Sequence, residues 1–263
     1  MKGGVASALV LAGRREGVVD AFAAAHGVDD KCLIPVGGRP MIAHVVSALA
    51  EVAGIDRIVI SANDPAILRR IPLLNELETA GRLVFAPASD NIADSVVRGA
   101  EGAVFPLLVT TADNVLFDPA SVREFGEGAA RQGADVAVAF APRQAVRAAH
   151  PDGQKRFYEF SDVAVSTCNA YWLAHERALG AVEAFRGGGQ FVKHPARIAR
   201  AFGIMNLIRF RFGMGRLDET FLRFSRRFGL DMRAVLLSRG ACAIDVDNDR
   251  TLRVTEEVLS NAA

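Results

Sequence analysis

Short apolar runs alternate with amphipathic segments through the first half of the chain. In five runs almost every position is apolar, the pattern of strands buried on both faces of a parallel sheet; these are residues 6–11, 57–61, 82–86, 105–111 and 134–140. The segments between them carry apolar positions at helical spacing, and most open on Pro or Asp-Pro; they start at residues 40, 64, 71, 92 and 118. This alternation predicts an α/β fold, with a mostly parallel sheet and helices on both faces.

The alternation stops after residue 142. Residues 143–170 mix polar and apolar positions and predict an irregular β segment over the sheet, whereas residues 171–185 have helical spacing. Three glycines at 187–189 predict a flexible link, and the chain closes with a strand near 241–244, an acidic run and a helix. We therefore predict a single domain over 1–263, with an insertion at 143–240 that includes a basic helical section at 191–239.

Composition narrows the class of protein. Of the 263 residues 51% are hydrophobic, enough for a large core, and a net charge of +1 argues against a general nucleic-acid binder. The three cysteines are far apart and odd in number, which favours free thiols in a reducing cytoplasm. The first residues resemble a signal peptide, but charged residues follow the apolar run, so we expect a buried first strand. No apolar run reaches the ~18 residues of a membrane helix.

The turn after the first strand predicts a phosphate site. It lies at the carboxyl edge of the predicted sheet, where open α/β folds bind ligands. Glycine exposes backbone N–H groups there, and the cations add fixed positive charge. The residues of this candidate site are Leu11, Ala12, Gly13, Arg14, Arg15 and, from the next loop, Lys31. The alternative is an ordinary strand–helix turn with solvated arginines, since the sequence is neither a Walker loop nor G-x-G-x-x-G.

Acidic residues follow two further predicted strands. Asp113 ends the apolar run FPLLVTTAD, at the same edge of the sheet. Asp245 and Asp247 follow the last strand, and alternation places them on one face of an extended segment. Carboxylates are ligands that Mg²⁺ binds, so acidic residues at this edge could hold a metal. The alternative is that these residues cap turns and helices.

These motifs together resemble the sugar-nucleotidyltransferase superfamily, in its MobA-like NTP transferase branch. Leu-Ala-Gly, then Arg and Gly, precede Lys31-x-Leu-x-Pro-Val-x-Gly-x-Pro-Met, and Asp245-Val-Asp247 resembles the family's Asp-x-Asp ending. The family turn has a further glycine where this chain has residues 14–16. The resemblance implies a Rossmann-like fold of the nucleotide-diphospho-sugar transferase type. It also implies Mg²⁺ as the cofactor, with Asp113 and either Asp247 or Asp245 as its ligands, Asp247 being slightly favoured.

The resemblance also implies residue roles. The triphosphate would contact the loop and Lys31, and the residues expected to take part in catalysis are Arg15, Lys31 and Asp113. Ser89 and Asn91 would contact the nucleotide's base and ribose, or simply cap a helix. Asn169 would lie on the acceptor side, where Lys193 of the basic section is a second candidate.

The predicted function is Mg²⁺-dependent transfer of an NMP moiety from an NTP to a phosphorylated acceptor, with release of pyrophosphate. The acceptor could be a sugar-, polyol- or cofactor-phosphate or a lipid headgroup. Residues 191–239 carry eleven Lys or Arg and three Asp or Glu. This basic section predicts one of three arrangements: a solvated arginine face on core helices, a site that binds an anionic acceptor, or a surface that contacts an anionic membrane. The competing functions are a nucleotide-sugar-dependent glycosyltransferase and a non-catalytic nucleotide-binding regulator.

Overall fold

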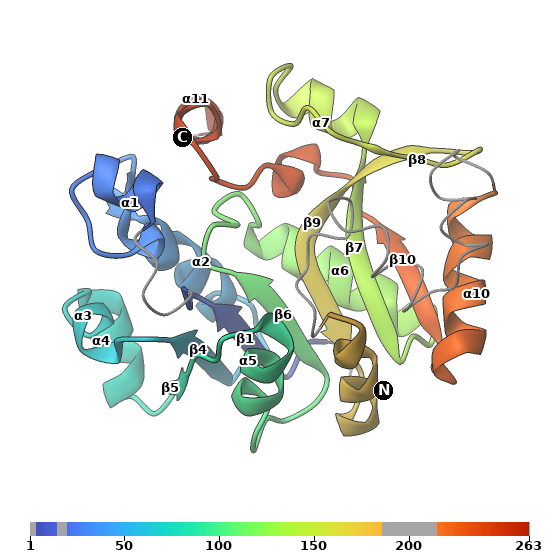
Figure 1. The fold of residues 1–263 in the computed structure, drawn as a ribbon, viewed down its shortest axis with the longest axis horizontal. Helices are drawn as coiled ribbons and strands as arrows, with labels where there is room; N and C mark the ends of the chain where they lie inside the picture. Colours follow the sequence, from blue (N-terminus) through green and yellow to red (C-terminus); the bar gives the residue numbers. More distant parts are fainter. Residues whose placement is uncertain (1–3, 15–19, 186–214, 263) are drawn as a thin grey trace.

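The computed structural model describes residues 4–14, 20–185 and 215–262. One sheet of eight strands forms its centre, in the order β10-β7-β9-β6-β1-β4-β5, with β8 paired to β9 (Figure 1). The strand β9 is antiparallel to β6 and β7, while the neighbouring pairs of the other strands in that order are parallel. The strands of this sheet are β1 (Ser7–Leu11), β4 (Arg57–Ala62), β5 (Leu83–Pro87), β6 (Leu107–Thr111), β7 (Val136–Pro142), β8 (Tyr158–Glu159), β9 (Ala164–Leu173) and β10 (Met232–Leu236).

Helices cover both faces of the sheet, as the alternation predicted (Figure 1). The helices on one face are α2 (Met41–Ala50), α4 (Pro72–Thr79), α6 (Pro119–Arg131), α7 (Arg143–Ala149) and α11 (Asp249–Ala262). On the other lie α5 (Ile92–Gly99), the 3-10 segment η2 (Glu176–Phe185) and α10 (Leu217–Phe228). Within β1, Ala8 and Val10 join the first core and Leu9 the second, so both faces of the strand are buried.

The remaining elements are short and lie near the carboxyl edge of the sheet or connect strands. They are α1 (Ala21–Ala25), the 3-10 helix η1 (Lys31–Leu33), the hairpin strands β2 (Pro35–Val36) and β3 (Arg39–Pro40), α3 (Pro65–Leu68) and the 3-10 helix η4 (Gly240–Ala243). Asp20, Asp64, Asn91 and Asp118 cap α1, α3, α5 and α6, because each side chain accepts backbone N–H bonds of the first turn.

The second half of the chain differs in detail from the predicted elements. The expected helix at 171–185 begins as the strand β9, where Tyr171 and Leu173 contact one core and Trp172 the other, and continues as η2. The expected strand at 241–244 is the 3-10 helix η4. Gly240 allows η4 to pack on α7, because a Cβ there would lie 2.0 Å from the backbone carbon of Ala145.

The segment 143–170, expected as irregular β structure, contains the helix α7 before β8 and β9. The expected basic helical section lies partly outside the described residues, at 191–214. Its described part contains the helix α10 and also the strand β10, which pairs with β7 at one edge of the sheet. The chain beyond residue 142 therefore contributes β9 and β10 to the same sheet as the first half.

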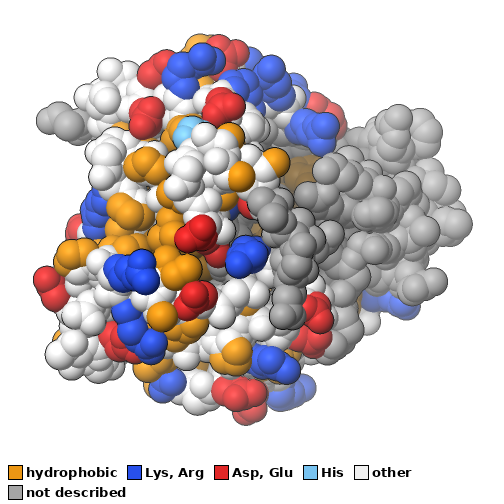
Figure 2. All heavy atoms as spheres, turned by 60° about the vertical axis from the view of Figure 1, so that its left-hand side comes forward, with side chains coloured by type: hydrophobic (Ala, Val, Ile, Leu, Met, Phe, Trp, Pro, Cys, Tyr) orange, Lys and Arg blue, Asp and Glu red, His pale blue; other side chains and the backbone are white. Residues whose placement is uncertain are grey.

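The surface is mixed in charge over the face that carries α1, α3 and α4. Figure 2 shows basic and acidic side chains interspersed there with hydrophobic ones. Among the described helices, none is both long enough and apolar enough to cross a membrane.

Candidate active site

The ends of two neighbouring strands define the candidate site. In the sheet Leu11 of β1 is the register partner of Thr111 of β6, and the N–H of Ala112 donates to the Leu11 carbonyl at 3.0 Å. The loop after β1 and the turn after β6 therefore start side by side at the carboxyl edge. This is the edge at which open α/β sheets bind ligands.

Three carboxylates gather at this edge. Asp113, Asp245 and Asp247 each offer an oxygen, and these oxygens lie within 4.8 Å of one another. The N–H of Val246 donates to the Asp113 carbonyl at 3.1 Å, and the Val246 side chain is buried in a small core. Because successive side chains of an extended segment point to opposite sides, this arrangement directs Asp245 and Asp247 toward Asp113.

Lys31 lies between two of these carboxylates. Its Nζ is 2.6 Å from Asp113 Oδ2 and 2.6 Å from Asp247 Oδ1. The lysine starts the 3-10 helix η1, whose N-cap Asp30 accepts the N–H of Cys32. Burial by itself lowers the pKa of Lys31, but Asp113 and Asp247 outweigh it and raise the pKa above its ordinary value. The ammonium is therefore charged and holds the two acidic segments together.

The surroundings of Asp245 favour its protonated form. Burial, followed by the negative charges of Asp113 and Asp247, raises the pKa of Asp245 to about 8. Asp113 is fixed from its other side, where Thr111 Oγ1 donates to Asp113 Oδ1 at 2.6 Å. Carboxylate oxygens are the ligands that Mg²⁺ prefers, so this donor set fits a divalent cation. The three aspartates would hold it.

The loop after β1 is held against two other turns. The backbone N–H of Arg14 donates to Asn63 Oδ1 at 2.7 Å, and Arg14 Nε lies 3.7 Å from Asp30 Oδ2. Gly13 is required by close approach, because a Cβ there would lie 2.5 Å from Ala88 Cβ. The loop therefore depends on Asn63, which sequence reasoning missed; its position directly after a buried strand was the available signal. Arg15 lies outside the described residues.

The proposed base-reading turn is ordered by its own hydrogen bonds. Asn91 caps α5 by accepting the N–H of Asp94 at 2.9 Å. The N–H of Ser89 donates to Ser95 Oγ at 2.9 Å, while Ser89 Oγ is buried without a hydrogen-bond partner among the described residues. The side chain of Asn91 thus has a capping role in this structure, and the turn lies next to Gly13 through Ala88.

On the other side of the cluster, β9 is irregular. Its register with β7 shifts between Val138 and Phe140, and Asn169 adopts a positive φ of 45°, which is uncommon outside glycine. Asn114, only 1% exposed, donates from Nδ2 to the Cys168 carbonyl at 2.7 Å and to Thr110 Oγ1 at 3.1 Å. The residue after Asp113 therefore ties the acidic turn to the segment that carries Asn169.

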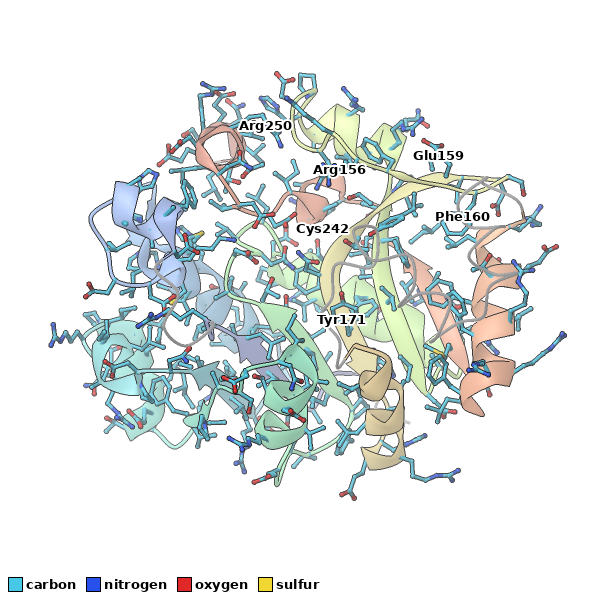
Figure 3. The ribbon with its side chains drawn as sticks, in the orientation of Figure 1. Arg156, Glu159, Phe160, Tyr171, Cys242 and Arg250 are labelled. Carbon is cyan, nitrogen blue, oxygen red and sulfur yellow. The ribbon has the colours of Figure 1, made fainter. Side chains whose placement is uncertain are left out.

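Asn114 is a second residue that sequence reasoning missed, because its partner Cys168 is 54 positions away in the chain. Cys168 Sγ also lies 3.4 Å from Cys242 Sγ, a contact that joins β9 to η4. Figure 3 labels Cys242, which lies just before the acidic segment. Burial raises the pKa of the Cys168 thiol, so it is a poor nucleophile. Lys193, the other predicted acceptor residue, lies outside the described residues.

Solved structures with the same fold include two transferases. A hypothetical transferase from Thermus thermophilus aligns with a TM-score of 0.75 and 24% identity, covering 94% of this chain and 98% of its own. A CMP:2-keto-3-deoxy-manno-octonic acid synthetase complexed with CTP aligns with a TM-score of 0.58 and 13% identity, covering 98% and 99%. At these identities the likeness shows the fold, which confirms the predicted Rossmann-like architecture of the nucleotide-diphospho-sugar transferase type.

Sequence comparison adds a relative and a family. A 3-deoxy-manno-octulosonate cytidylyltransferase from Rhodospirillum centenum is 31% identical over 122 residues, which are 46% of this chain and 47% of that protein. The chain therefore spans about half the length of this curated relative. The model of the MobA-like NTP transferase domain matches residues 8–201. This match covers most of the chain, including the loop, Lys31 and Asp113, and it shows that the chain belongs to the MobA-like NTP transferase family, a family of nucleotidyltransferases.

Proposed function

We propose that this protein is a Mg²⁺-dependent nucleotidyltransferase that transfers CMP from CTP to an anionic acceptor and releases pyrophosphate. The observation that carries the proposal is the convergence of Lys31, Asp113, Asp245 and Asp247 beside the loop after β1. Triphosphate chemistry needs fixed cations for the anionic oxygens and carboxylates for a metal, and this site offers both.

The reaction requires little covalent chemistry from the protein. An oxygen of the acceptor attacks the α-phosphorus of the NTP, a new P–O bond forms, and the bond to the bridging oxygen of the β-phosphate breaks to release pyrophosphate. A phosphate acceptor is already ionised, so no general base is needed, whereas a sugar hydroxyl would have to give its proton to a base or to water as it attacks. Mg²⁺, when bound, would neutralise charge on the α-phosphate.

The residues of the chain would orient the substrates. Lys31 would donate to the triphosphate, and the loop after β1 would offer the backbone N–H of Gly13 and the guanidinium of Arg14. Arg15 is proposed for the same role. Asn169, with its left-handed backbone beside the acidic cluster, would contact the acceptor, and Lys193 would add charge there. Ser89 and Asn91 would contact the nucleoside.

The choice of CTP rests on the relatives. One is named a cytidylyltransferase and another was solved with CTP. Their names point to a sugar acid as acceptor, and the excess of basic residues in 191–239 supports an anionic acceptor of this class or a phosphorylated sugar, polyol or cofactor. We further propose a cytoplasmic location, since the three described cysteines are free. Contact of residues 191–239 with an anionic membrane stays a prediction, which vesicle flotation tests.

A ligand screen tests the nucleotide part of the proposal. The melting temperature of the purified protein is measured with CTP, GTP, UTP or ATP, each with MgCl₂ or with EDTA. A ligand that binds only the folded state at about 100 times its Kd stabilises it by about 2.7 kcal/mol, so CTP with Mg²⁺ should raise the melting temperature most. Equal melting curves for all four nucleotides would contradict the proposed preference for CTP. A glycosyltransferase or a regulator would bind nucleotides without releasing pyrophosphate.

A further inference from the structure

Lys31 bonds to the carboxylates that a metal would need. Its ammonium bridges Asp113 Oδ2 and Asp247 Oδ1, at 2.6 Å from each. Lys31 and Asp113 are 24% and 19% exposed, so water screens this half of the bridge weakly, whereas Asp247 is 57% exposed and its half is screened more. Asp113 Oδ1 already accepts from Thr111. In the structure, therefore, the cation bound by the acidic cluster is the protein's own.

A divalent metal and this ammonium compete for the same oxygens. Mg²⁺ binds carboxylate oxygens at about 2.0–2.1 Å, so an ammonium held by the same oxygens would lie close to the metal. Two cations at such a separation repel each other in a partly buried site. An NTP changes this balance, because its phosphate oxygens offer Lys31 another set of acceptors.

We propose that Lys31 couples metal binding to nucleotide binding. Its ammonium bridges Asp113 and Asp247 in the free enzyme and moves to the triphosphate when an NTP binds, which leaves both carboxylates to the metal. This inference rests on the proposed nucleotidyl-transfer site. It adds that nucleotide binding promotes metal binding at that site. Because coupling between two sites is reciprocal, CTP should raise the affinity for the metal by the same factor as the metal raises the affinity for CTP.

Substitution of Lys31 should move the two affinities in opposite directions. Mn²⁺ serves as the probe, and its binding is followed by calorimetry and by the spin-resonance signal of the free ion. Without nucleotide, Lys31→Met should bind Mn²⁺ roughly tenfold more tightly than the wild type, a factor typical of coupled sites. With saturating Mn²⁺, the same variant should bind CTP at least roughly tenfold more weakly. A general loss of structure would weaken both.

Lys155→Met is the matched control, since Lys155 is exposed and makes no ion pair with the described residues; it should leave both affinities unchanged. Lys31→Gln repeats the test with a neutral polar side chain. If either folded Lys31 variant binds Mn²⁺ no more tightly than the wild type, while the wild type still binds CTP with Mn²⁺, the coupling is wrong and the proposed function stands. If the wild type binds neither CTP in the presence of Mn²⁺ nor Mn²⁺ in the presence of CTP, the proposed function itself is wrong.

Discussion

Gly13→Ala should displace the loop after β1, which we propose binds the nucleotide, through a single contact, and Ala88→Gly should restore its position. A Cβ on Gly13 would lie 2.5 Å from Ala88 Cβ, whereas its next neighbour, Asn63 Oδ1, would be 3.5 Å away. Carbon atoms in contact rest at about 3.5–4.0 Å, so the loop must move by about 1 Å. Gly13 has no positive φ, and the contact alone decides the outcome.

The expected magnitude follows from what the displacement breaks. Overpacking costs about 1–3 kcal/mol. The hydrogen bond from Arg14 N to Asn63 Oδ1, now 2.7 Å, would be lost as well, which adds about 1 kcal/mol. Gly13→Ala should therefore lower the free energy of unfolding by about 2–4 kcal/mol. A shift of about 1 Å in a substrate-positioning loop also lowers turnover by roughly 100-fold.

Urea unfolding and the CTP thermal shift, measured on a double-mutant cycle, test this reasoning. Ala88→Gly alone should cost about 1 kcal/mol through chain flexibility. The double variant Gly13→Ala/Ala88→Gly should regain most of the stability and CTP binding, with an interaction free energy of about 1–3 kcal/mol in its favour. A double variant whose losses are the sum of the two single variants would refute the contact as the cause, as would a Gly13→Ala protein with wild-type stability.

Three further predictions concern the cluster, its support and the opposite end of the sheet. Asp113→Asn should keep the fold but lower pyrophosphate release by about 100-fold or more, and a steady-state assay with circular dichroism as the folding control decides this. Gly240→Ala should lower the melting temperature because a Cβ would lie 2.0 Å from the α7 backbone. A Cβ at Gly180 would have no non-neighbouring atom of the described residues within 4 Å, so alanine should be tolerated there; equal melting curves for the two variants would contradict the packing of η4. At Asp135 a hydrogen bond from the backbone N–H of Asp231 lowers the carboxyl pKa, so this group stabilises the fold above its unfolded pKa of about 3.9 and ceases to do so as the pH falls through its folded pKa. The stability advantage of the wild type over Asp135→Ala should shrink below pH ~4, and urea titrations at several pH values would reveal a constant advantage if the reasoning is wrong.

The first half of the fold follows from local patterns. The strands β1, β4, β5, β6 and β7 of the main sheet are apolar runs. The caps of α1, α3, α5 and α6 are Asp or Asn, whose side chains have a physical preference for that place. Asp113 could be predicted at the edge because it directly follows a buried strand. Asp245 and Asp247 could be paired because alternation puts them on one side of an extended segment.

The remaining parts of the fold and of the candidate site depend on contacts between segments that are distant in the chain. The run that contains Tyr171 has apolar residues at a spacing that suits a helix, and only its place between β6 and β7 makes it the strand β9. Asn63 and Asn114 act through Arg14 and Cys168, which are distant in the chain, so no local signal identifies their partners. That Lys31 bridges two carboxylates could not be predicted either, because the sequence suggested phosphate as its partner.

Pyrophosphate release is the measurement that tests the central claim most directly. The wild type and Asp113→Asn are assayed with each of the four NTPs, with MgCl₂ or EDTA, and with a panel of sugar acids and sugar and polyol phosphates as acceptors. The account predicts release by the wild type with one NTP, CTP above all, that requires both an acceptor and the divalent metal and is lost in Asp113→Asn. Release that survives EDTA, or that is equal in the two proteins, would contradict the account.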